Sequence, residues 1–210
     1  MTRKGIEVDG VNPHDIIVAN KLAIVWRYKE ILTLAGFNIK HPAMERTAER
    51  MWEVLEIMTR GYDIDVSLER MYDDYTPEGT LPTLRVCPGI EFVSMCEHHL
   101  LPFIGVCHIA YIPNKRMVTG LSKLPQLVQK YALRPQLQEK MQEEIANELI
   151  QKCGFEDVMV VVAAKHGCEV VEGIKYTYSR DPPYPTSTIR GLFITNEPLR
   201  AEALKLMGIT

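Results

Sequence analysis

The stretch that decides the fold runs from residue 94 to residue 103 and reads Ser94-Met95-Cys96-Glu97-His98-His99-Leu100-Leu101-Pro102-Phe103. Cys96 and His99 form a C-x-x-H spacing, whose thiolate and imidazole suit zinc or a similar borderline metal. A second cluster, Lys165-His166-Gly167-Cys168, lies far downstream. If folding joins the clusters, they offer three metal ligands, Cys96, His99 and Cys168, and leave two histidines over, His98 and His166.

The number of ligands separates a catalytic metal site from a structural one. Three protein ligands leave a tetrahedral metal one open position, where water becomes a nucleophile, and two spare imidazoles beside it can carry protons. An isolated C-x-x-H is a weak signal, and the downstream cluster strengthens it. The spacing leaves open a closed structural zinc, with His98 or His166 as the fourth ligand.

The composition is that of an ordinary globular protein. The 210 residues are 46% hydrophobic and 24% charged, and the net charge of -3 argues against a nucleic-acid binder. No apolar stretch is long enough to cross a bilayer, and the first residues lack the apolar core of a secretory signal. Five irregularly spaced cysteines argue against a disulfide framework, so we expect a cytoplasmic protein with no membrane partner.

The hydrophobic pattern changes from helical to extended near residue 83. Helices are expected at 13–36, 42–61, 68–72, 122–133, 135–153 and 197–207. Strands are expected at 84–93 with an interruption at Pro88-Gly89, and at 104–112, 157–164, 168–178 and 186–194, with turn or loop at 113–115 and 180–185. His166 and Cys168 would lie at the tip of a hairpin, and Cys107 and His108 would be packing residues. This order predicts an α+β protein whose antiparallel sheet has helices on one face, and oligomerisation would cover its edges.

Several motifs in the same order resemble the GTP cyclohydrolase I family over roughly residues 40 to 200. They are the stretch 94–103, Tyr-Ile-Pro-Asn, Gly-Leu-Ser-Lys-Leu, Arg-Pro-Gln-Leu-Gln-Glu, His166-Gly-Cys168 and Thr-Ser-Thr. The resemblance implies a tunnelling fold (T-fold), with residues 1–82 as an N-terminal arm and helical region and 83–210 as the catalytic domain. It also implies a homo-oligomer, a decamer with active sites at subunit interfaces.

The resemblance further implies a role for each site residue. Cys96, His99 and Cys168 would hold Zn2+, and His98 and His166 would handle protons. Glu139, with Gln138 beside it, would recognise the guanine edge, and Ser122, Lys123 and a neighbouring subunit's Arg50 would contact the phosphates of a guanine nucleotide. Zinc-activated water would attack C8 of GTP, and the opened ring would release formate and give dihydroneopterin triphosphate.

Two positions depart from the family pattern, and both concern the phosphates. Glu172 and Gln126 stand where the family usually has arginine, and an anion in a triphosphate pocket weakens binding. Arg180 or Arg190 would be the replacement cation. Three hypotheses follow: a GTP cyclohydrolase with rearranged phosphate contacts, the same chemistry on a less phosphorylated or modified guanine nucleotide, or a non-catalytic zinc-containing assembly or regulatory protein.

Overall fold

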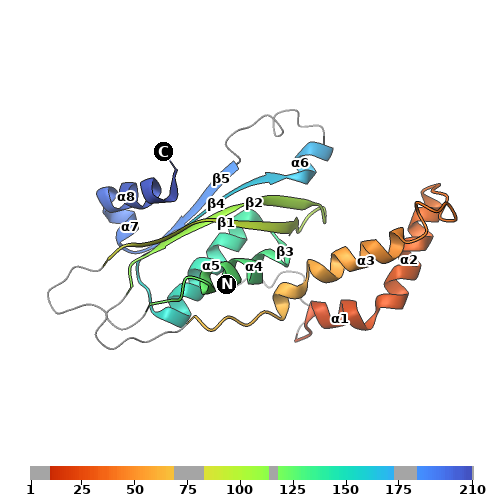
Figure 1. The fold of residues 1–210 in the computed structure, drawn as a ribbon, viewed down its shortest axis with the longest axis horizontal. Helices are drawn as coiled ribbons and strands as arrows, with labels where there is room; N and C mark the ends of the chain where they lie inside the picture. Colours follow the sequence, from red (N-terminus) through yellow and green to blue (C-terminus); the bar gives the residue numbers. More distant parts are fainter. Residues whose placement is uncertain (1–9, 69–82, 114–117, 173–183, 210) are drawn as a thin grey trace. The chain divides into compact units, whose positions relative to one another are not determined.

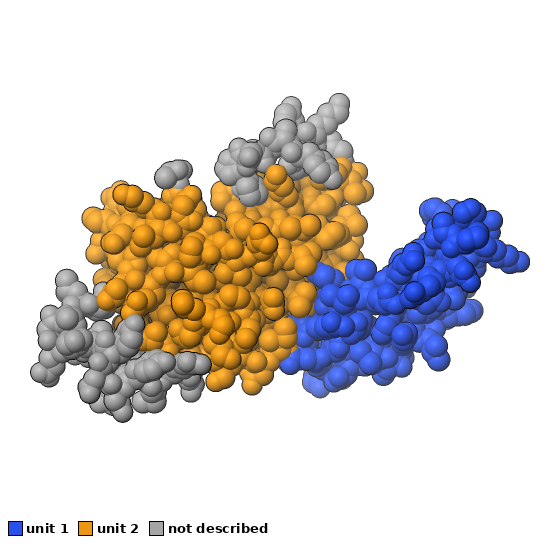
Figure 2. All heavy atoms as spheres, in the orientation of Figure 1, with its two compact units in different colours: residues 1–63 blue, residues 64–210 orange. Residues whose placement is uncertain are grey.

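The computed structural model describes residues 10–68, 83–113, 118–172 and 184–209 (Figure 1). The chain forms two compact units, residues 1–63 and residues 64–210, which are coloured separately in Figure 2. Val66 and Leu68 belong to the buried core of the second unit. The domain boundary predicted after residue 82 lies at the end of a segment outside the described residues, and it stays a prediction. The helix expected at 68–72 and the turn at 113–115 also fall mostly outside them.

The first unit contains α1 (Pro13–Ala19), α2 (Lys21–Leu34), α3 (Thr47–Ile57) and the 3-10 helix η1 (Arg60–Tyr62). The prediction of one helix over 13–36 is wrong, because the side-chain amide of Asn20 donates to the carbonyl of Ile16 at 2.9 Å and the helix is interrupted there. The predicted second helix begins later than expected, at Thr47, after a series of turns. Trp52 packs in the small core of this unit and donates its indole N–H to the carbonyl of Ile17.

The second unit is built on a five-stranded sheet in the order β3-β1-β2-β4-β5. Its strands are β1 (Arg85–Cys96), β2 (Pro102–Tyr111), β3 (Pro135–Gln136), β4 (Val158–His166) and β5 (Tyr184–Ile189). The pairs β1–β2, β2–β4 and β4–β5 are antiparallel, and β3 adds a short parallel pair to β1. The interruption predicted at Pro88-Gly89 is confirmed as a register shift in β1, where Gly89 has a φ of 67°.

Helices pack against both faces of this sheet, and not against one face as predicted, because alternate residues of β4 point in opposite directions and both sets are apolar. Val158, Val160 and Val162 share the main core with α4 (Lys123–Ala132) and α5 (Gln138–Cys153). Met159 and Val161 share a second core with α7 (Leu192–Thr195) and α8 (Glu197–Met207). The α+β class and the antiparallel sheet are therefore confirmed. None of the described helices combines the length and the hydrophobicity needed to cross a membrane.

The strand predicted over 168–178 is wrong at its start, where the chain forms the helix α6 (Gly167–Val171). The two valines of this segment favour extended structure locally, but the carbonyl of Cys168 accepts from the amide of Glu172 and closes a helical turn. Residues 173–183 lie outside the described residues. The partner of β4 is instead β5, which already includes the predicted loop residues 184 and 185. This position at the sheet edge tolerates Pro185.

A buried carboxylate, Glu148, joins α4 to α5. It accepts from Lys130 at 2.7 and 2.8 Å, from the hydroxyl of Tyr131 and from Lys152. Burial alone would raise the pKa of Glu148, but these three donors together hold that pKa below its usual value. Lys152 also reaches Asp65 and the carbonyl of Val66, so the same group fastens the start of the second unit.

We expect Glu148→Gln to lower the free energy of unfolding by about 2 kcal/mol near neutral pH, because a charged acceptor of buried donors is lost. The folded-state pKa lies below the unfolded one, so this contribution is present above about pH 4.3 and is lost as the pH falls through the folded value. Denaturant unfolding at a series of pH values should show the gap between wild type and variant closing in acid. Glu202→Gln, at an exposed site on α8, is the control and should leave stability unchanged.

Candidate metal centre

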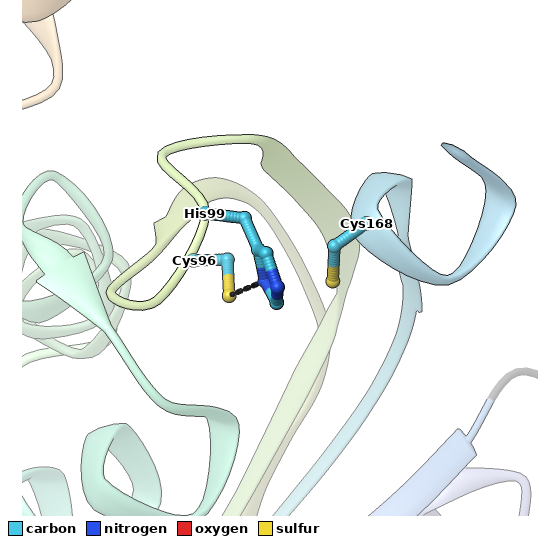
Figure 3. A group of neighbouring side chains, drawn as sticks. All are labelled: Cys96, His99 and Cys168. Carbon is cyan, nitrogen blue, oxygen red and sulfur yellow. Dashed lines mark hydrogen bonds between the residues drawn. The ribbon is translucent and has the colours of Figure 1, made fainter. Parts of the chain in front are cut away.

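Cys96 ends β1, and His99 follows in the loop between β1 and β2. Two backbone hydrogen bonds close it, from the amide of Cys96 to the carbonyl of Leu101 and from the amide of Leu100 to the carbonyl of Cys96, both at 2.8 Å. Leu100 has a φ of 53°, and among the described residues it is the one non-glycine residue in the left-handed region. This conformation turns the chain sharply back toward β2, and the side chains of Cys96 and His99 project from the end of β1 and the loop that follows it (Figure 3).

Cys168 reaches the same place from α6. A Cβ atom added to Gly167 would lie 2.7 Å from the carbonyl oxygen of Pro102, so only glycine allows α6 to begin this close to the start of β2. In the sheet, Phe103 of β2 pairs with His166 of β4. The downstream cluster is thereby brought against the upstream one, as the sequence predicted.

The ligand atoms of Cys96, His99 and Cys168 all lie within 4.8 Å of one another, and the group could hold a metal ion. Figure 3 shows both sulfurs and the imidazole converging on one point. The Sγ of Cys96 lies 3.5 Å from the Nδ1 of His99. That separation is close to the roughly 3.5 Å between ligand atoms of a tetrahedral zinc with bonds of about 2.0–2.3 Å.

The electrostatics of the group also fit a bound cation. Burial raises the pKa of the Cys168 thiol, and the neighbouring Cys96 raises it further. A cation placed between the two sulfurs would offset both effects and favour the thiolate forms that bind zinc. The donor set of two sulfurs and one nitrogen is one that zinc accepts, with a fourth position left for another group.

His166 is fixed beside this group by two contacts. Its ring stacks on Phe103, with ring centroids 4.6 Å apart and an angle of 5° between the planes. Its Nε2 lies 2.8 Å from the Oε1 of Gln138. Burial lowers the pKa of His166, and the nearby carboxylates of Glu169 and Glu139 oppose that shift. His98, on the loop, is exposed, and its ring lies 6.0 Å from that of His99.

Gln138 has a role that the sequence did not reveal. Its buried side-chain amide donates to the carbonyls of Val162 and Tyr184 and to the hydroxyl of Thr186, at 2.8 to 3.1 Å. These contacts fix which atom is the oxygen, so Oε1 faces His166 and accepts from its Nε2–H. The Nδ1 of His166 then carries a lone pair. The predicted contact of Gln138 with substrate stays a prediction.

The other residues predicted to bind the substrate are not among the candidate metal ligands. Glu139 is exposed in the first turn of α5. Ser122 is exposed and precedes α4, where Lys123 donates to Gln126 at 3.3 Å. Arg50 is exposed on α3 of the first unit. Their roles at the phosphates and the guanine edge stay predictions.

Of the two proposed replacement cations, Arg190 is already engaged. It donates to Glu143 and to the carbonyl of Ile189, and Glu143 also accepts from Thr188. These contacts fasten the end of β5 to α5, so they serve the packing of the sheet. Arg180 lies outside the described residues.

Two acidic side chains, Glu97 and Glu172, lie near the ligands in contacts that the sequence did not reveal. Glu97 forms an ion pair with Lys140 at 3.3 Å, and the Oε1 of Glu172 lies 3.1 Å from the Nε2 of His99. Glu172 is four residues after Cys168, a spacing that places both on one side of a helix but not at neighbouring positions of a strand. The incorrect strand prediction for this segment therefore hid the contact.

Comparison with known proteins agrees with the geometry. The model of the GTP cyclohydrolase I family matches residues 24–208. GTP cyclohydrolase 1 of Campylobacter jejuni subsp. doylei is 37% identical over 180 residues, covering 86% of this chain and 92% of the relative. The enzyme of that name from Carboxydothermus hydrogenoformans is 39% identical over 180 residues, covering 85% and 90%. That from Hyperthermus butylicus is 34% identical over 188 residues, covering 90% and 91%.

Replacing either cysteine of the group should abolish stoichiometric metal binding, because two remaining ligands hold zinc weakly. We expect Cys96→Ala and Cys168→Ala each to lose bound zinc, measured by elemental analysis after equilibration with a metal buffer. Cys87→Ala is the matched control, since Cys87 is a half-buried free cysteine on β1 outside the group. Full zinc content in both site variants would show that these sulfurs are not ligands.

Proposed function

Because the chain belongs to the GTP cyclohydrolase I family, we propose that it is a zinc-dependent hydrolase that opens the imidazole ring of GTP and yields 7,8-dihydroneopterin triphosphate and formate. The observation that carries this proposal is the convergence of Cys96, His99 and Cys168 beside two further histidines. The mixed sheet with its helices is consistent with the T-fold of this family.

The ligand group fits zinc, and a zinc ion there supplies Lewis-acid activation of water. Cys96, His99 and Cys168 would hold it and leave the fourth position open. A closed structural site would need a fourth protein ligand. The contacts of His166 favour a role other than that of a fourth metal ligand. Gln138 is hydrogen-bonded to its Nε2, and the stacking on Phe103 restrains rotation of the ring.

The two remaining histidines would move the protons of the reaction. His166 has a lone pair on Nδ1 in the tautomer that Gln138 selects, so this atom would accept or return a proton at the purine ring. His98 is exposed on the metal-binding loop, where it would exchange protons with the substrate and with solvent. Together they would protonate N7 and assist hydrolysis of the formamide that ring opening produces.

Binding of the nucleotide would use residues outside the ligand group. Glu139, at an exposed position one residue after Gln138, would accept from N1–H and the 2-amino group of guanine. Ser122 and Lys123 would bind phosphate at the start of α4, with Arg50 supplied by a neighbouring subunit. This arrangement requires a homo-oligomer, which we propose is a decamer with interface active sites, in the cytoplasm.

A second candidate substrate is a guanine nucleotide with fewer phosphates or a modified sugar. Two observations favour it: Gln126 and Glu172 replace the arginines expected there, and Arg190 is engaged by Glu143. A pocket with fewer cations would retain the ring-opening chemistry and bind a triphosphate less tightly.

Turnover of GTP, GDP, GMP and dGTP by the zinc-loaded protein separates these candidates. We expect formate release and pterin fluorescence with GTP as the preferred substrate, because the chain covers nearly the whole length of its relatives. A higher kcat/KM for a lower phosphate or a deoxynucleotide would establish the second candidate. A zinc-loaded protein that releases formate from none of them would be a non-catalytic member of the family.

The histidine roles predict a separation of metal binding from turnover. His98→Ala and His166→Ala should retain zinc and lower kcat by about 100-fold or more, because general acid–base groups contribute factors of that size. His41→Ala, in an exposed position of the first unit, is the control and should retain both zinc and turnover. Loss of zinc from either site variant would mean that the residue is a ligand.

A further inference from the structure

Glu172 approaches His99 at the ring nitrogen that does not meet Cys96. The Nδ1 of His99 lies 3.5 Å from the Sγ of Cys96, whereas its Nε2 lies 3.1 Å from the Oε1 of Glu172. The two ring nitrogens therefore have different partners, a sulfur of the ligand group and a carboxylate. A metal held by this group would meet Nδ1.

We propose that Glu172 is a positioning residue for the metal site, whose carboxylate accepts the Nε2–H of His99 and directs Nδ1 to the metal. The inference rests on the proposed function only in taking zinc as the metal. Glu172 then acts through His99 and does not touch the substrate. Glu172 stands where the family usually has arginine, and in this chain it would orient a metal ligand.

The chemistry of imidazole supports this assignment. A neutral imidazole that binds a metal through Nδ1 must carry its hydrogen on Nε2. A carboxylate only accepts, so it stabilises that tautomer and no other, and it increases the electron donation of the ring to the metal. Metal-binding histidines in proteins commonly have a carboxylate, a backbone carbonyl or water at this second nitrogen.

The position of Glu172 on the chain supports it as well. Glu172 is the C-cap residue that follows α6, and its amide donates to the carbonyl of Cys168 at 2.9 Å. One helical turn therefore carries a ligand and the acceptor for a second ligand. Glu169, on the same turn, is placed differently, since its carboxylate acts on His166. Gly167 lets α6 pack closely against the start of β2, and this packing fixes the positions of both Cys168 and Glu172.

The exposure of the pair excludes a large contribution to fold stability. The side chains of His99 and Glu172 are 41% and 54% exposed, and ion pairs at such sites add little to the stability of a fold. Orientation of a ligand is a role that such a contact can fill. It also accounts for an acid near a predicted phosphate site, because a carboxylate directed at His99 is not directed at a nucleotide.

Zinc affinity of the full-length protein, measured by competition with a chromogenic chelator, tests the inference without substrate. We expect Glu172→Ala to raise the Kd for zinc by about 10- to 100-fold, the usual effect of removing such a partner. Glu172→Gln retains an oxygen acceptor and should show a smaller rise. Glu169→Ala is the matched control, because it removes the same charge from the same turn and should leave the Kd within about twofold. Visible spectra of the cobalt-loaded proteins should change for Glu172→Ala and not for Glu169→Ala.

Steady-state kinetics with GTP at saturating zinc distinguishes positioning from a phosphate contact. We expect KM for GTP to be unchanged in Glu172→Ala. An unchanged zinc Kd in Glu172→Ala would overturn the inference, and a lower KM together with that result would place the carboxylate in the phosphate pocket. Zinc affinity does not depend on turnover, so a wild-type protein inactive on GTP would refute the proposed function and leave this inference to be judged by the Kd alone.

Discussion

The pairing of β2 with β4 is the constraint on which the metal group depends. Phe103 lies opposite His166 in that ladder, and the metal-binding loop runs directly into β2 while α6 directly follows β4. Val158, Val160 and Val162 fill the main core while Met159 and Val161 fill the second one, so two cores together hold β4 in this ladder. The same register brings Cys168 to Cys96. Packing of apolar residues thus determines a site made of polar ones.

Much of the fold follows from local patterns. The terminal helix 197–207, the strands β1, β2 and β4 and the break at Pro88-Gly89 were predicted because each has a clear period, a continuous apolar run or a residue with restricted geometry. The predictions from sequence were wrong where a tertiary contact outweighs a local conformational preference. Asn20 looks like one more helical residue until its side chain bonds the backbone, and the valines of α6 look extended until Gly167 fits against Pro102.

The residues of the metal site also divide into those that local patterns predict and those that they do not. Cys96, His99 and Cys168 could be predicted because their residue types and spacing are uncommon, and the structure brings them together. The partners that orient the histidines could not be predicted. Gln138 and Glu172 are ordinary polar residues, and their significance depends on distances to His166 and His99 that no local pattern encodes. Residues that touch a metal are recognisable by type, whereas residues that orient its ligands are recognisable by position.

Leu100 has a consequence for the motion of the metal-binding loop. A leucine in the left-handed region costs roughly 1–2 kcal/mol, so the two hydrogen bonds that close the loop must outweigh that cost. A glycine there would remove the strain but would also admit backbone conformations of both hands. His99 is the preceding residue, and its ring would then occupy a wider range of positions on the timescale of loop motion. The left-handed leucine therefore restricts the range of positions that the His99 imidazole can take before a metal ion binds.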